Sequence, residues 1–181
     1  MTAYRRLRMT GGSYFFTVAL ADRRASTLVD HVGALRGAFA ATQAERPFSC
    51  NATVILPDHL HAVWTLPAGD ADFSTRWGAI KSRFTRAVKA SGKMGWNPIL
   101  RSRSQVAKGD AGIWQRRFWE HCIRDAADFE RHVRYCWGNP VKHGYVARAE
   151  DWPHSSIHRD IRLGRVLPKW AGGVELGDFG E

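Results

Sequence analysis

Two histidines stand one residue apart in the stretch PDHLHAVWTL, Pro57 to Leu66, directly before a run of apolar residues. Side chains at positions i and i+2 of a strand point to the same face, so His59 and His61 would lie side by side and Leu60 would face the opposite way. Two neutral imidazoles can bind a divalent cation and leave coordination positions open for a phosphate oxygen. A hydrogen-bonded structural pair is the alternative, and the spacing alone does not decide between them.

A candidate nucleophile lies further along the chain, in the stretch ERHVRYCWGNPVKHG from Glu130 to Gly144. Tyr135 and Asn139 are four residues apart, which is about one helical turn. Both fall off the apolar stripe of that segment, so a tyrosine that merely covers surface is the alternative. A phenol can attack phosphorus once it is deprotonated and a metal ion withdraws charge from the phosphate.

The composition of the chain favours contact with nucleic acid. Its 181 residues include 27 Lys and Arg against 17 Asp and Glu, for a net charge of +10, together with 8 Trp and 9 Phe. Guanidinium groups bind phosphates, and aromatic rings stack on unpaired bases. The alternative is a basic surface that only keeps the protein in solution.

Other features exclude several classes of protein. The 3 cysteines are widely spaced and form no C-x-x-C pair, which supports neither a zinc ribbon nor a disulfide framework. No apolar run reaches the ~20 residues of a membrane span, and the first residues lack the apolar segment of a signal peptide. We therefore expect a cytoplasmic protein, associated with the nucleoid if it binds DNA. The chain also lacks a phosphate-binding glycine loop and a convincing acidic triad.

A single α+β domain over residues 1–181 is expected to position these groups. Aromatic and β-branched runs predict strands at 13–20, 50–56 and 116–123. The histidines would lie on a further strand, which follows the second directly through a tight Pro57-Asp58 connection.

Helical periodicity predicts three helices between and after these strands. They cover residues 25–45, residues 73–88, and a segment from a cap at Asp125 to Asn139-Pro140, packed through Phe129, Val133 and Trp137. The order of elements predicts a ferredoxin-like antiparallel sheet with its helices on one face and the histidine strand in the centre. Residues 89–112 lack periodicity and indicate a variable basic loop.

The stretches quoted above resemble a known family. PDHLHAVWTL is similar to the HUH motif, in which two histidines flank a bulky apolar residue, and YCWGNPVKHG is similar to the tyrosine-helix segment of the same superfamily. Further stretches resemble the REP-associated tyrosine transposases of the IS200 group, namely YRRLRMTGG, RPF, DFSTRWGAIKSRFT, IWQRRFWEH and DWPHSSIHRD. The likeness covers nearly the whole chain except residues 89–112 and the C-terminal end.

This resemblance implies a metal-dependent enzyme that nicks and joins single-stranded DNA at REP-type hairpins. His59 and His61 would bind Mg²⁺ or Mn²⁺, with Asn139 as a further ligand. Tyr135 would attack a phosphodiester, leaving a 5′-phosphotyrosine and a 3′-OH. Gly138 stands where many relatives carry a bulky residue, and glycine there suggests a cap or hinge at the helix end. The family implies a monomer, although dimers that exchange tyrosine helices occur in the superfamily.

Basic, aromatic and small polar residues in the family's motifs are the expected DNA contacts. Arginines alternate with aromatic residues in WQRRFWEH, glycines permit close approach of a backbone, and the tail from residue 142 offers short hydrogen-bond donors. The expected contacts are Arg5, Arg6, Gly11, Gly12, Arg76, Lys81, Arg83, Trp114, Arg116, Arg117, Lys142, His143, His154, Ser155, Ser156, His158 and Arg159.

Two other functions stay open at this point. A catalytically silent hairpin-binding protein would bind the same DNA and form no covalent adduct. A hydrolytic metalloenzyme would use the histidine pair with water as the nucleophile. It would also form no adduct, and it would tolerate the loss of Tyr135.

Overall fold

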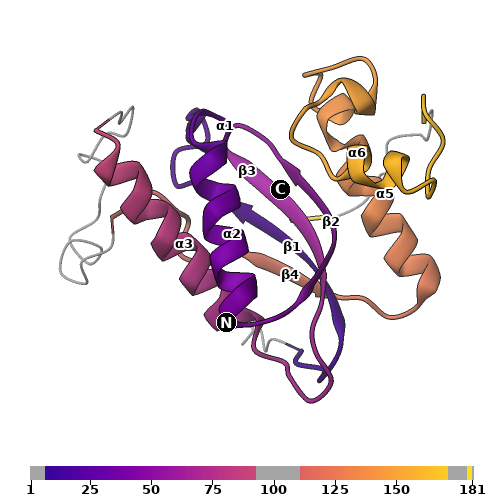
Figure 1. Ribbon diagram of the computed structural model, residues 1–181, viewed down its shortest axis with the longest axis horizontal. Coiled ribbons are helices and arrows are strands. Elements are labelled where there is room, and N and C mark those ends of the chain that lie inside the picture. The colour runs from indigo at the N-terminus through magenta and orange to yellow at the C-terminus, as the bar shows by residue number, and fades with distance from the viewer. Residues whose placement is uncertain (1–6, 93–110, 171–178, 181) are drawn as a thin grey trace, which may run out of the picture.

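The computed structural model describes residues 7–92, 111–170 and 179–180. A four-stranded sheet in the order β2-β3-β1-β4 forms its centre (Figure 1). The strands are β1 (Ser13–Ala19), β2 (Ser49–Ile55), β3 (His59–Thr65) and β4 (Trp119–Cys122), and each neighbouring pair is antiparallel. This is the predicted ferredoxin-like order, with the histidine strand β3 inside the sheet.

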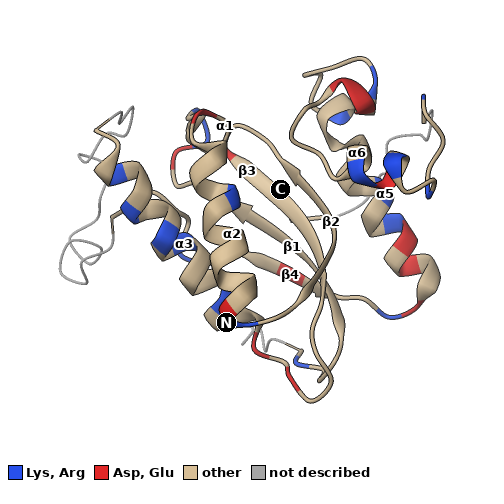
Figure 2. Cartoon of the chain, in the orientation of Figure 1, with Lys and Arg blue, Asp and Glu red and all other residues tan. Residues whose placement is uncertain are grey.

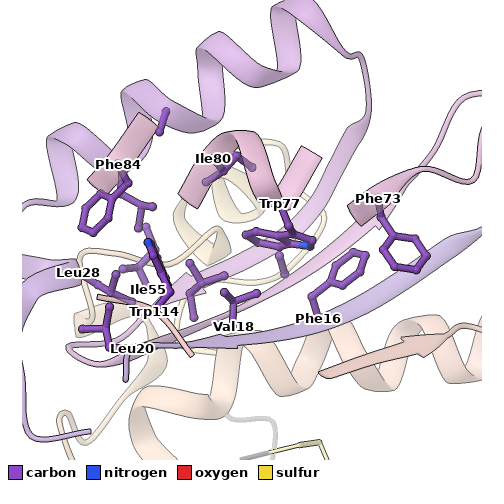
Figure 3. Close-up of a cluster of buried hydrophobic side chains, with 14 of the residues drawn as sticks. Phe16, Val18, Leu20, Leu28, Ile55, Phe73, Trp77, Ile80, Phe84 and Trp114 are labelled. Atoms are coloured by element: carbon purple, nitrogen blue, oxygen red, sulfur yellow. The ribbon is translucent and has the colours of Figure 1, made fainter. Parts of the chain in front are cut away.

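One face of the sheet packs against two helices, α2 (Val32–Glu45) and α3 (Phe73–Ala90). Phe16 and Val18 of β1 meet Trp77 of α3 in this core (Figure 3). The predicted helix over residues 25–45 is divided, because a separate turn, α1 (Thr27–Asp30), ends at His31 before α2 begins.

Helix α5 (Ala126–Lys142) covers the opposite face of the sheet (Figure 1). Phe15 of β1 and Val63 of β3 pack there against Val133 and Cys136 of the helix. The prediction that all helices lie on one face was therefore wrong, although it holds for α2 and α3. Both faces of the sheet are apolar, so each of them needs a cover.

The start of α5 agrees with the sequence prediction. The carboxylate of Asp125 accepts a hydrogen bond from the backbone N–H of Asp128 at 2.8 Å, which caps the first turn. This cap fixes where the helix begins and therefore which of its side chains face the sheet.

The end of α5 differs from the prediction. The helix continues through Gly138 and Pro140 instead of ending at Asn139-Pro140. Proline's fixed φ is compatible with a helix, and so close to the helix end its missing N–H and its ring disturb only one turn. The turn is made at Gly144, whose φ of +71° is open to glycine. Its N–H bonds to the carbonyl of Val141, and the N–H of Tyr145 bonds to that of Pro140.

The segment after α5 closes the outer edge of β2. It contains a short 3-10 helix, η2 (Ala149–Asp151), and α6 (Ile157–Arg162). The N–H of Ile55 donates to the carbonyl of His154, and the N–H of Ser156 donates to that of Thr53. These bonds protect a strand edge that would otherwise be open to pairing with another chain. Within the described ranges, no helix combines the length and apolar character needed to span a membrane.

Candidate active site

His59 and His61 lie side by side on the face of β3 that α5 covers, as their spacing predicts. Their ring centroids are 5.0 Å apart and both side chains are buried. Leu60, between them, packs into the opposite core. The strand is interior and paired on both sides, so the two imidazoles have a rigid support.

His59 is held by a carboxylate. Its Nδ1 lies 2.8 Å from Oδ1 of Asp58, and Nε of Arg23 lies 2.6 Å from the other carboxylate oxygen. Burial opposes ionisation of Asp58, but the hydrogen bond and charge of His59 and the charge of Arg23 outweigh it and lower its pKa. An ionised carboxylate only accepts hydrogen bonds, so Nδ1 of His59 donates to Asp58. In the neutral form of the ring, which is the form that binds a metal ion, the lone pair is then on Nε2.

His61 has the same arrangement with a hydroxyl in place of the carboxylate. Its Nδ1 lies 2.9 Å from Oγ1 of Thr17, the residue opposite it in the β1–β3 register. The Thr17 hydroxyl donates its proton to the carbonyl of Phe179, so its oxygen accepts from Nδ1 of His61. Both histidines therefore present Nε2 as the atom that can bind a metal ion.

Tyr135 lies on the same face of the sheet and in the same chain. The centroid of its ring is 5.1 Å from that of His61, and the side chain is 1% exposed. The expectation that Tyr135 and Asn139 fall off the packed side of α5 was wrong, since both are buried like Val133 and Trp137. Helix α5 contacts β2 and β3 on one side and also contacts η2. Residues 135–140 of the helix are therefore all buried.

Asn139 stands between two helix positions that contact the histidines. Tyr135 is next to His61, and the ring centroid of His143 is 5.1 Å from that of His59. Positions 135, 139 and 143 follow one another at four-residue spacing, so they share one face of the helix. Two imidazole nitrogens and an amide oxygen are a donor set that fits a divalent cation and leaves positions open for substrate.

Lys142 is the residue that directly contacts the phenol oxygen of Tyr135. Its Nζ donates to that oxygen at 3.0 Å and lies 5.0 Å from the ring centroid. An adjacent ammonium stabilises negative charge on the oxygen after the phenol proton has left. Lys142 is one of the residues expected to contact DNA, and no pattern in the sequence indicated its contact with the phenol of Tyr135.

Phe179 covers Tyr135. The two rings stack with centroids 3.6 Å apart and an angle of 15° between their planes. The phenol face that points toward Phe179 is therefore not accessible to DNA in this conformation. No local pattern in the sequence indicated that Phe179 or Thr17 belongs to the site. Asp58 could have been found, because it directly precedes His59.

Three of the expected DNA contacts meet on the other side of the sheet. Lys81, Trp114 and Arg116 line a groove of about 380 Å³ together with Arg86 and Lys89. Figure 2 shows basic residues repeated along α3. Nζ of Lys81 lies 5.5 Å from the ring centroid of Trp114. The groove therefore combines several positively charged side chains with the aromatic ring of Trp114.

Three of the expected arginine contacts make hydrogen bonds or ion pairs within the fold. Arg76 is 3% exposed and donates to the carbonyls of Asp72, Arg46 and Pro47. The guanidinium of Arg83 binds the carboxylate of Glu45. Arg159 donates to backbone carbonyls of β2, and these bonds hold α6 to the sheet; the acceptors are Cys50 and Asn51.

The two glycines and several tail residues also stabilise the fold. Gly11 has a φ of +67°, and a Cβ on Gly12 would lie 2.9 Å from the carbonyl oxygen of Met9, so the turn before β1 requires both glycines. The remaining tail contacts are hydrogen bonds within the segment or to β2, made by the side chains of Ser155, Ser156 and His158. Arg117 and His143 are exposed and His154 is partly exposed, whereas Arg5 and Arg6 and most of the basic loop lie outside the described residues.

A second cluster of possible metal ligands lies at the start of α5. Ligand atoms of His121, Asp128 and His132 are all within 4.8 Å of one another. The Asp128 carboxylate already accepts from Arg124, Arg131 and His121. The positive charge of two guanidiniums opposes a cation there, and the bond between His121 and Asp128 instead fastens β4 to α5.

Comparisons with known proteins agree with this geometry. No family model matches the chain. A REP-associated tyrosine transposase of Escherichia coli K12 is 44% identical over 181 residues, which is 100% of this chain and 98% of the relative. A Haemophilus influenzae relative with the same family description is 41% identical and covers 97% of each chain. A solved structure of a REP-associated tyrosine transposase bound to a REP hairpin superposes with a TM-score of 0.84 at 43% identity, covering 100% of this chain and 98% of that one.

Proposed function

The chain belongs to the REP-associated tyrosine transposases, and from this premise we propose that it nicks and rejoins single-stranded DNA at REP-type hairpins. One observation carries the proposal. The ring of Tyr135 lies 5.1 Å from that of His61, beside the paired imidazoles and within a single chain. A nucleophile and a metal-binding pair at this separation can act on one phosphate.

His59, His61 and Asn139 would hold the divalent cation, Mg²⁺ or Mn²⁺. The ion would supply charge that polarises the scissile phosphate. The protein provides the ligands in a fixed orientation, because Asp58 and Thr17 hold the two imidazoles by Nδ1. Support for the site comes from the chemistry of these donors and from their burial.

Tyr135 would be the nucleophile. Its phenol loses a proton, Lys142 stabilises the phenolate, and the oxygen attacks phosphorus. A bond from the tyrosine oxygen to phosphorus forms while the bond from phosphorus to the 3′ oxygen breaks, and that oxygen takes up a proton. The products are a 5′-phosphotyrosine and a 3′-OH. One phosphodiester replaces another, so the step is reversible and attack by a 3′-OH rejoins the strand.

The DNA would occupy both sides of the sheet. The solved relative binds a REP hairpin, and the same class of ligand fits this chain. The groove of Lys81, Trp114 and Arg116 would bind stem phosphates. The strand to be cut would reach Tyr135 once Phe179 has left the face of its ring. His59, His61 and Tyr135 all come from one chain, which supports a monomer as the active form. We expect it to act on nucleoid DNA in the cytoplasm.

The experiment that tests this proposal uses hairpin oligonucleotides labelled at the 5′ or the 3′ end, with Mg²⁺ or Mn²⁺. We expect denaturing electrophoresis to show a protein adduct that carries only the 3′ label, since the 5′-phosphate is attached to tyrosine. A silent hairpin-binding protein would retain both labels in intact DNA. A hydrolytic metalloenzyme would release two DNA fragments without an adduct.

A further inference from the structure

A line of aromatic rings leads from the candidate metal site to the surface. The ring centroid of His143 lies 5.1 Å from that of His59, and the centroid of Tyr145 lies 6.0 Å from that of His143. Trp152 follows, with its centroid 5.3 Å from that of Tyr145 and 30° between the ring planes. The outer two rings form a pair that we call the aromatic platform, Tyr145 and Trp152.

The turn at the end of α5 puts Tyr145 in this place. Gly144 adopts a φ of +71° and reverses the chain, and the N–H of Tyr145 bonds back to the carbonyl of Pro140 at 3.0 Å. The distance from the helix face that carries Tyr135 and His143 to the platform is therefore fixed by a hydrogen-bonded turn. A flexible loop would not fix it.

Trp152 is fixed from the other side. Its indole Nε1 donates to the carbonyl of Ile55, the last residue of β2, at 2.9 Å. His158 bonds through Nε2 to the Trp152 carbonyl at 2.8 Å. The indole is partly buried, whereas Tyr145 is 44% exposed, among the largest exposures of an apolar or aromatic side chain in the described part of the chain. The platform thus combines a phenol that is nearly half exposed with an indole whose position is fixed by a hydrogen bond.

The surroundings of Tyr145 keep it neutral. Burial and the nearby Asp58 carboxylate raise the pKa of its phenol, and the Arg23 guanidinium opposes them. A neutral ring can stack on a base of any type, because every base has a π face. Arg23, whose charge acts on Tyr145, and Lys142, which contacts Tyr135, add positive charge near these rings, which favours a strand with a phosphate backbone.

We propose that the aromatic platform binds an unpaired base of the DNA strand beside the scissile phosphate, by stacking on Tyr145. The inference rests on the proposed function, since the site must act on DNA. It adds a preference for one kind of DNA, which the catalytic groups do not provide. A single-stranded flank can offer an unstacked base to the platform, while a blunt duplex end cannot. The platform would therefore select hairpins with a single-stranded flank.

The test measures binding without added metal, so that it does not depend on cleavage. The probes are a REP-type hairpin with 2-aminopurine in an unpaired flank and the same hairpin without a flank. We expect the wild type to bind the flanked hairpin more tightly and to quench its fluorescence. Tyr145→Ala should lose about 5- to 100-fold in affinity for the flanked hairpin, as expected for one base–aromatic stack, and keep its affinity for the blunt one.

Tyr145→Phe is the matched variant, because it keeps the ring and removes only the hydroxyl. It should retain affinity and quenching, which separates stacking from a fold defect. Equal loss for both hairpins in Tyr145→Ala, or quenching that survives in that variant, would overturn the inference. A failure of the proposed function would look different from a failure of this inference. In that case the wild type would form no covalent adduct, but quenching would still depend on Tyr145.

Discussion

Nζ of Lys142 lies 3.0 Å from the phenol oxygen of Tyr135, two turns back along α5. An ammonium at this distance stabilises a developing phenolate, and the helix itself sets the separation of the two groups. The candidate nucleophile and this ammonium are therefore carried by one helix.

Removal of this ammonium should slow the chemical step. In Lys142→Met we expect single-turnover adduct formation to fall by about tenfold or more, since loss of one charged donor to a reacting oxygen typically has an effect of this size or larger. The rate is measured at saturating DNA, so that any loss of hairpin affinity from the missing positive charge does not affect it. Lys169→Met, an exposed lysine outside the site, is the control. An unchanged rate would show that Lys142 does not assist Tyr135.

The hydroxyl of Thr17 should influence metal binding through His61. Thr17→Val removes the acceptor that fixes Nδ1 of His61, and loss of such a partner commonly weakens metal affinity about 10-fold or more. Titration calorimetry with Mn²⁺ measures this. Thr65→Val, which removes a hydroxyl at the other end of β3, should bind the ion like the wild type. Equal affinity in Thr17→Val would argue against the assigned tautomer.

Phe179 should compete with DNA for the face of Tyr135, because the two rings are stacked at 3.6 Å. In Phe179→Ala the uncovered conformation becomes more populated, and we expect adduct formation at subsaturating DNA to rise by up to about tenfold. Rapid-quench sampling measures the rate. Leu167→Ala, at a position 80% exposed, is the control. A slower reaction in Phe179→Ala would mean that the ring supports the nucleophile instead of covering it.

Asp128 should stabilise the fold in a pH-dependent way. Burial raises the pKa of its carboxyl, but hydrogen bonds from His121, Arg124 and Arg131 outweigh burial and hold it well below its usual range. The unfolded chain protonates near pH 4 and the folded one only at lower pH, so the contribution is full above about pH 4 and falls as the pH drops further.

Asp128→Asn should therefore cost about 2 kcal/mol of the free energy of unfolding at pH 6, since the neutral amide loses charged hydrogen bonds. Urea titrations at pH 6 and pH 3 measure the difference between wild type and variant. We expect this difference to shrink at pH 3. A difference that is constant across that range would contradict the assigned ionisation.

Local sequence patterns predicted the parts of the site that depend on local spacing. The strand period placed His59 and His61 on one face, and helix spacing placed Tyr135 and Asn139 one turn apart. The prediction for the end of α5 was wrong because it assigned the break to Pro140, whereas Gly144 makes the turn. Proline in the last turn of a helix lacks one N–H and crowds one carbonyl, but its φ stays helical.

Local sequence patterns could not predict contacts between segments that are distant in the sequence. Thr17 reaches His61 through the register of β1 on β3, a pairing across 44 positions of sequence. Arg76 and Arg159 were expected on DNA because arginine in a basic chain suggests phosphate contact. Their carbonyl acceptors lie in segments that only the fold brings near, so their structural roles became visible with the structure.

The most direct test of the account is to identify the residue that carries DNA after reaction with a REP-type hairpin and Mn²⁺. Protease digestion and mass spectrometry of the adduct should locate a 5′-phosphonucleotide on Tyr135, and Tyr135→Phe should bind the hairpin and form no adduct. DNA attached to another residue, or cleavage by Tyr135→Phe at the wild-type rate, would contradict the assignment of the nucleophile.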